Sequence, residues 1–162
     1  MKIDATVALD HPLERYAFDL QEAPTVWKTP LNVDFIGEIH VWGEYWSEEG
    51  SVHIQGNIAA RLDAKCSRCL VPMEYPLQLE VEGIFARQQD VENEVYELQG
   101  KQVLLDKFIL DEISLALPSQ YLCTPDCKGL CPKCGVNRNL EACDCDISSN
   151  GLNPFEQLKD LF

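Results

Sequence analysis

Eight cysteines in a chain of 162 residues constrain this sequence more than any other feature. They form four close pairs with one to three intervening residues, namely Cys66/Cys69, Cys123/Cys127, Cys131/Cys134 and Cys143/Cys145. Tetrahedral zinc takes four thiolates, so two sites would account for all eight. All-cysteine sites are closed to further ligands, and this favours a structural metal over a catalytic one.

The spacing favours one division of the cysteines into two sites. The knuckle at 131–134 is followed by Gly135, which lets the backbone turn, and a short loop then leads back to residues 143–145. This predicts a compact local site of Cys131, Cys134, Cys143 and Cys145. The other site would join Cys66 and Cys69 to Cys123 and Cys127. A site built from Cys123, Cys127, Cys131 and Cys134 is the main alternative, and spacing alone does not decide between them.

The N-terminal residues and the hydropathy of the chain indicate whether its thiols are reduced or oxidised. Residues 1–4 have neither a basic nor an apolar signal-peptide region, and no run of apolar residues is long enough to cross a membrane. We therefore expect a cytoplasmic protein without membrane contact, in which thiols stay reduced and bind metal rather than form disulfides. Iron–sulfur ligation and thiol-redox chemistry remain alternatives, although no thioredoxin-like context surrounds either C-x2-C pair.

Alternation of apolar and polar residues predicts three consecutive strands, at about residues 35–46, 52–63 and 73–82. The connections are short, so the strands should form an antiparallel meander. The first cysteine pair would then lie at the tip of the second hairpin. Pro76 indicates an edge position or a bulge in the third strand.

The flanking segments complete the predicted architecture. Weak alternation indicates strands within residues 1–9 and 15–20, and residues 88–102 are expected to form an acidic loop with room for one short strand. Asp106 is the predicted N-cap of a helix that ends at Leu117 before a proline, and a short helix should follow Asn153.

We therefore predict an α+β, mostly β fold, with an antiparallel meander or barrel-like sheet and one packed helix. Residues 1–119 would form the β-rich domain, with its helix at about 106–117. Residues 120–162 would form a zinc-binding segment with the short C-terminal helix, tied to the sheet through the knuckle at 66–69.

The formal net charge of −14 limits the partners of the chain. Two filled four-thiolate zinc sites would make it about −18. Such a chain is repelled by bare nucleic acid, whereas a basic protein is an easier partner. Six basic side chains near the cysteines are candidate RNA or phosphate contacts, or ordinary solvated residues: Arg61, Lys65, Arg68, Lys128, Lys133 and Arg138.

Nothing else in the sequence indicates a catalytic apparatus. Three histidines are scattered, and of these His40 and His53 lie on neighbouring predicted strands and could meet across the sheet. At least one of Trp27, Trp42 and Trp46 is expected in the core. No phosphate-binding, nucleophile-elbow or metalloprotease motif is present. We therefore expect no enzymatic activity and no small-molecule substrate.

The order of these features resembles the YceD family, also called the large ribosomal RNA subunit accumulation protein family. The resemblance spans roughly residues 35–162. It rests on an acidic loop and on CSRCLVP at 66–72, LALP at 115–118, CKGLCPKCGVNRN at 127–139 and NPFEQLK at 153–159. The cysteines of the family correspond to all eight positions of this chain.

The resemblance implies a non-catalytic role in the accumulation of 23S ribosomal RNA or in large-subunit assembly. The partner would be the RNA itself or a basic ribosomal or assembly protein. A thiol-redox protein, or an interaction module that affects RNA only indirectly, are the competing interpretations.

Overall fold

The structure is a computed structural model, and it describes residues 1–23, 34–88 and 95–145. The predicted helix after Asn153 and the position of Trp27 lie outside these residues. No helix within the described ranges is long and apolar enough to cross a membrane.

Three long strands form the body of the molecule: β4 (Ile39–Glu48), β5 (Ser51–Lys65) and β6 (Pro72–Ala86). They pair antiparallel in chain order, so the predicted meander is confirmed. Glu49 and Gly50, both with positive φ, form the turn between β4 and β5. Alternate residues of each strand are buried, such as Ile39 and Val41 in β4 and Ile54 and Ile58 in β5.

The short strands extend this body on both sides. The strand order is β1 (Lys2–Asp4), β8 (Gln102–Leu104), β7 (Val95–Gln99), β6, β5, β4 and β2 (Tyr16–Glu22), while β3 (Asp34–Phe35) pairs with β5. The pairing of β6 with β7 is parallel, so the sheet outside the predicted antiparallel meander is mixed. Pro76 lies where β6 pairs only with β5, at an edge as predicted.

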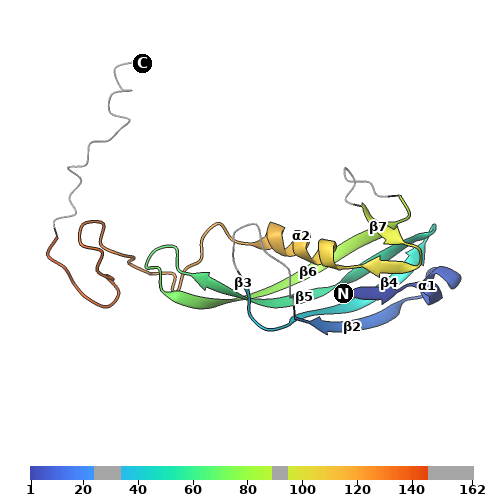
Figure 1. Ribbon diagram of the computed structural model, residues 1–162, viewed down its shortest axis with the longest axis horizontal. Helices are drawn as coiled ribbons and strands as arrows, with labels where there is room; N and C mark the ends of the chain where they lie inside the picture. The colour runs from blue at the N-terminus through green and yellow to red at the C-terminus, as the bar shows by residue number, and fades with distance from the viewer. Residues whose placement is uncertain (24–33, 89–94, 146–162) are drawn as a thin grey trace, which may run out of the picture.

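The two ends of the strand order approach each other, and the sheet is therefore nearly closed into a barrel (Figure 1). The hydroxyl of Tyr45 in β4 donates a hydrogen bond of 3.4 Å to the carbonyl of Asp4 in β1. The ammonium group of Met1 lies 3.2 Å from the carboxylate of Glu22 at the end of β2. The predicted mostly β, barrel-like fold is thus confirmed.

The N-terminal segment differs from the expectation of one strand. Only Lys2–Asp4 is extended, and a short helix α1 (Thr6–Asp10) follows. The Asp4 carboxylate accepts a hydrogen bond of 2.9 Å from the Thr6 amide and turns the chain there. Ala5 and Ala8 are fully buried, so close packing of small side chains replaces strand pairing.

Helix α2 (Asp106–Ala116) covers one face of the sheet. Phe108, Ile109 and Ile113 are fully buried, and the ring of Phe108 meets Phe85 of β6 edge-on at 5.7 Å. A Cβ at Gly83 would lie 2.8 Å from the Phe108 ring, so glycine is required there. The N-cap is Leu105 rather than Asp106, because Asp106 occupies the first turn and its carboxylate binds the Met1 ammonium group.

The opposite face of the sheet carries aromatic side chains. Trp42 and Trp46 are half-buried there and do not belong to the core, and Trp27, the third tryptophan for which a core position was expected, lies outside the described residues. Trp42 stacks on His40 at 4.3 Å, and Trp46 stacks on His53 at 5.5 Å. His40 is opposite Ala59 and His53 is opposite Trp46, so the two histidines do not meet.

Candidate metal centres

The eight cysteines gather into two groups of four. Cys66, Cys69, Cys123 and Cys127 form the sheet cluster, and Cys131, Cys134, Cys143 and Cys145 form the tail cluster. Within each group all sulfur atoms lie within 4.8 Å of one another. This is the division favoured by the spacing, and the alternative set of residues 123, 127, 131 and 134 is not formed. Figure 1 shows the chain after α2 running to the end of the sheet that lies opposite α1, with residues 131–145 beyond that end.

Sulfur–sulfur distances in the sheet cluster fit a single tetrahedral ion. The Sγ atoms of Cys66 and Cys127 are 3.7 Å apart, and those of Cys69 and Cys123 are 3.6 Å apart. Four sulfurs at about 2.3 Å from a central ion are separated by about 3.8 Å. A disulfide would bring two of them to about 2 Å. Both clusters could therefore hold a metal ion, and all eight cysteines are free.

The sheet cluster forms where the hairpin tip of β5 and β6 meets the segment after α2. In the knuckle, the Leu70 amide donates to the Cys66 carbonyl at 2.9 Å, and Leu70 has a positive φ. Two hydrogen bonds then join Ser67 to Tyr121. The Ser67 amide donates to the Tyr121 carbonyl at 2.7 Å, and the Tyr121 amide donates to the Ser67 hydroxyl at 3.1 Å. The ring of Tyr121 also packs edge-on against Tyr75 at 5.1 Å.

The tail cluster depends on a short local knuckle. The Gly135 amide donates to the Cys131 carbonyl at 2.8 Å, and the Cys131 amide donates to the Val136 carbonyl at 2.8 Å. Gly135 has a φ of +75°, which glycine adopts without strain. All four ligands come from residues 131–145, so this cluster is held to the sheet by the chain segment before Cys131 and by the contacts that residues 137–139 make with that segment.

That connecting segment is fixed by contacts that the sequence did not predict. The side-chain amide of Asn139 donates to the sulfur of Cys127 at 3.3 Å, and its oxygen accepts from the Lys128 amide at 2.7 Å. Arg68 donates from its guanidinium to the Cys127 carbonyl at 2.9 Å. The sequence signal for Asn139 is its place at the end of the motif at 127–139.

The thiols within each cluster differ in their tendency to ionise. Backbone amides of Cys123, Cys69 and Arg68 lower the pKa of the Cys66 thiol to about 6. Amides of Cys134 and Lys133 likewise lower the pKa of Cys131 to about 6. The neighbouring thiol of Cys134, together with burial, raises the pKa of Cys145 to about 12. One thiolate thus forms readily in each cluster, and further negative charge needs a positive ion to offset it.

Burial differs between the two clusters. Cys66, Cys69 and Cys127 are buried and only Cys123 is exposed, whereas in the tail cluster only Cys131 is buried. The sheet cluster is therefore part of the folded body, and the tail cluster lies largely in contact with solvent.

The structure brings together some of the predicted basic contacts. All six side chains are exposed. The backbones of Arg68, Lys128 and Arg138 lie together around Gly129, because the Leu130 amide donates to the Arg68 carbonyl and the Arg138 amide donates to the Gly129 carbonyl, both at 3.0 Å. Lys65 ends β5, and Lys133 lies on the tail knuckle. Arg61 is separate, since it lies on the sheet within 3.5 Å of Glu74.

Comparison with known families gives the family of the chain. The family model described as "Large ribosomal RNA subunit accumulation protein YceD" matches residues 54–162, which include both clusters. The chain belongs to the YceD family. The resemblance to this family is thus confirmed over residues 54–162, whereas it was expected from about residue 35.

Individual relatives share shorter stretches. An uncharacterised protein of Mycobacterium tuberculosis H37Rv is 35% identical over 91 residues, which cover 52% of this chain and 44% of that protein. The chloroplastic large ribosomal RNA subunit accumulation protein YCED homolog 1 of Arabidopsis thaliana is 34% identical over 62 residues, or 37% of this chain and 19% of that protein. Its maize counterpart is 38% identical over 58 residues, or 35% and 20%. The matches thus span less than half the length of these relatives. No solved structure matches the chain.

Proposed function

We propose that this YceD-family chain is a non-catalytic factor that supports the accumulation of large-subunit ribosomal RNA, which is 23S rRNA in bacteria. The observation that carries the proposal is the family match over residues 54–162. It is supported by the plant relatives, whose names give this role. The closed four-cysteine clusters agree with a scaffold role, since they leave no open coordination position for a reaction.

The metal that we propose for both clusters is zinc. Four cysteine sulfurs with separations of 3.6 to 3.7 Å in the sheet cluster suit tetrahedral thiolate coordination, which zinc prefers. Zinc would bind to Cys66, Cys69, Cys123 and Cys127, and to Cys131, Cys134, Cys143 and Cys145. Its contribution would be positive charge and fixed geometry, while the chain's own amides and Asn139 orient the sulfurs.

The partner in this role would be rRNA or a basic ribosomal or assembly protein. Arg68, Lys128 and Arg138 around Gly129 are the candidate phosphate contacts that the fold brings closest together. The same cations also offset the negative charge of filled thiolate clusters. A cytoplasmic location, no membrane partner and no small-molecule substrate remain our expectations for this role.

Depletion of the protein in its source organism tests the proposal. We expect the ratio of large-subunit to small-subunit rRNA to fall and to recover when the wild-type gene is restored. Restoration with Cys66→Ser should fail, whereas Glu97→Gln, an exposed change on β7, should succeed. An unchanged rRNA ratio after full depletion would refute the proposed function.

Metal and thiol content of the purified protein tests the cofactor. We expect two zinc ions per chain and no reactive thiols until a chelator is added. One zinc with four reactive thiols would favour a thiol-redox protein instead. Disulfides without metal would overturn the zinc proposal for both clusters.

A further inference from the structure

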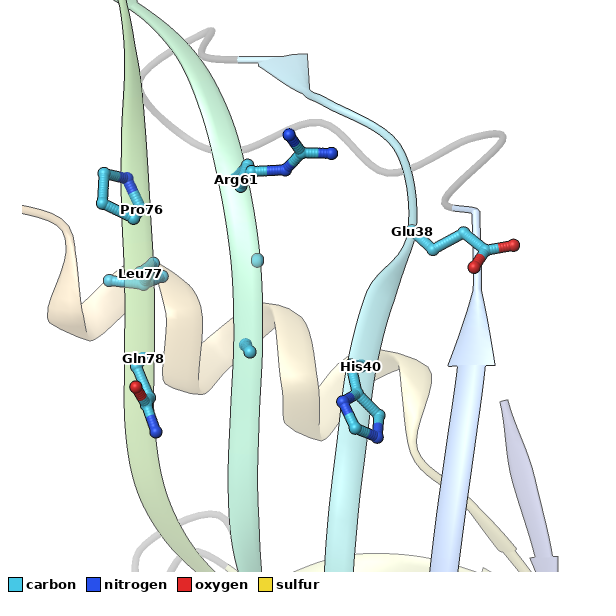
Figure 2. A pocket seen from close by; sticks show the side chains of 8 residues that line it. Glu38, His40, Arg61, Pro76, Leu77 and Gln78 are labelled. Atoms are coloured by element: carbon cyan, nitrogen blue, oxygen red, sulfur yellow. The ribbon is translucent and has the colours of Figure 1, made fainter.

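One face of the sheet has no covering element among the described residues. It is the face of β2, β4, β5 and β6 turned away from α2, centred on Trp42, Gln55, Asn57, Glu80 and Glu82, and we name it the open face. Figure 2 views it with α2 behind the strands. Cross-strand pairing places Trp42 opposite Asn57 and Asn57 opposite Glu80, so these three side chains form one row.

Three hollows follow one another along β5 on the open face. The first is lined by Trp46, His53 and Ile84, and the second by carboxylates and amides around Gln55 and Asn57. The third, with His40, Arg61 and Gln78 on its walls, is shown in Figure 2. From position 53 to position 61 a strand rises about 27 Å, the length of an extended segment of about eight residues.

Negative charge dominates the centre of this face. Glu44, Glu80 and Glu82 line the middle hollow, and Asp19 lies opposite Trp42 in the next strand. Among the described residues, two basic side chains lie within 4 Å of one of these four carboxylates. The imidazole of His40 lies 3.0 Å from Asp19, and the guanidinium of Arg15 lies 3.2 Å from Glu44. The side chain of Asp19 remains 69% exposed.

Arg15 shows what kind of group this surface accommodates. Its guanidinium lies 4.2 Å from the ring centre of Trp46 while it binds Glu44. An indole face beside a carboxylate attracts a guanidinium through both cation–π and charge-assisted contacts. Trp42 offers a second indole, which His40 covers on one side, with Asp19 opposite it on β2 and Glu80 beyond Asn57 on β6.

We infer that the open face binds an extended, arginine- and lysine-rich segment of a protein partner. Cationic side chains of the segment enter the hollow of Glu44, Glu80 and Glu82 and stack on Trp42. Nucleic acid fits this face poorly, because base stacking on tryptophan needs a positive groove for the phosphates, and here carboxylates surround the ring. A second copy of the chain would bring like charges together. Only the place of this partner in large-subunit assembly rests on the proposed function.

Binding to a defined peptide tests the inference. The probe is a fluorescein-labelled peptide of about twelve residues in which arginine alternates with serine, so that an extended chain presents arginines on one side. Fluorescence anisotropy with the full chain at low ionic strength should show saturable binding. An oligouridine RNA of similar length should bind more weakly.

Matched variants separate the open face from the overall charge. Glu80→Gln with Glu82→Gln keeps side-chain shape and should weaken peptide binding about five- to tenfold. Glu97→Gln with Glu141→Gln removes the same charge elsewhere and should leave the dissociation constant within about twofold. Trp42→Leu should weaken binding about threefold, with an unchanged melting temperature as the check on folding.

Three results would overturn the inference: no peptide binding by the wild-type chain, equal weakening by both double variants, or tighter binding of oligouridine that Trp42→Leu abolishes. The last would identify a nucleic-acid surface. Failure of the proposed function is a separate result, since an unchanged rRNA ratio after depletion would leave the peptide binding intact.

Discussion

The sheet cluster and the tail cluster have the same four ligand types but differ in what holds the ligands in place. Cys66 and Cys127 are 61 residues apart in sequence, and strand pairing together with the Ser67–Tyr121 bonds brings their segments together. The tail cluster needs only residues 131–145 and a glycine turn. The sheet cluster therefore depends on the whole fold, whereas the tail cluster depends only on a short segment attached to it.

Loss of one ligand should show this difference most strongly. Cys66→Ser should lower the melting temperature by about 10 °C or more, since structural zinc contributes many kcal/mol and about 1 kcal/mol shifts a domain of this size by 2–4 °C. Cys134→Ser, at an exposed position, should shift it by less than about 4 °C. Thermal unfolding followed by circular dichroism measures both. Equal shifts would show that the two clusters belong to one cooperative unit.

Chelation should release the two proposed zinc ions at different rates. Three buried ligands protect the sheet cluster, so its ion should leave at least about tenfold more slowly than that of the tail cluster. Native mass spectrometry during treatment with EDTA would show a one-metal species that accumulates. If that species keeps its metal at residues 131–145, as cysteine alkylation would reveal, the proposed order is wrong.

Two glycines allow a finer comparison. Gly129 and Gly135 have φ of +70° and +75°, but a Cβ at Gly129 would lie 3.0 Å from the Arg68 carbonyl, whereas one at Gly135 would meet nothing within 4 Å. Gly135→Ala therefore involves only backbone strain, about 1 kcal/mol, and Gly129→Ala should cost about 2–3 kcal/mol in the free energy of unfolding. Urea denaturation monitored by tyrosine and tryptophan fluorescence measures both, and equal losses would contradict the tight contact at Arg68.

The smallest expected effect concerns the link between the clusters. Asn139→Ala removes the bond to the Cys127 sulfur and the bond from the Lys128 amide, and should cost about 1 kcal/mol. Leu140→Ala is the adjacent control, since that side chain is 80% exposed and its loss should be nearly neutral. A similar loss in both variants would mean that Asn139 does not support the sheet cluster.

Strong local patterns predicted much of this structure. Period-two alternation located β4, β5 and β6, because each buries one side of a long ladder, and Pro118 together with an apolar stripe located α2. The cysteine grouping followed from the short loop after Gly135 and from the hairpin tip at Cys66. These features depend on neighbours in sequence or on one repeated contact.

The missed features depend on contacts between distant segments. The parallel pairing of β6 with β7 involves three residue pairs, and nothing in residues 95–99 encodes its direction. The short helix α1 replaces a strand because Ala5 and Ala8 fit a tight space that only the assembled sheet creates. Among the predicted basic contacts, Arg61 is on the open face with Glu74 because residue alternation within β5 turns it there.

The sequence separation within the sheet cluster also has a consequence for the order of folding events. Closing the loop from Cys66 to Cys127 costs only about 1 kcal/mol more than closing residues 131–145, so entropy alone does not separate the two steps. The slow event is the docking of the segment after α2 on the hairpin tip of β5 and β6, because it joins Cys123 and Cys127 to residues distant in sequence. The tail segment can take up its ion while the rest of the chain is still unfolded. A newly made chain would then acquire its two ions in sequence, and the second uptake would mark completion of the sheet.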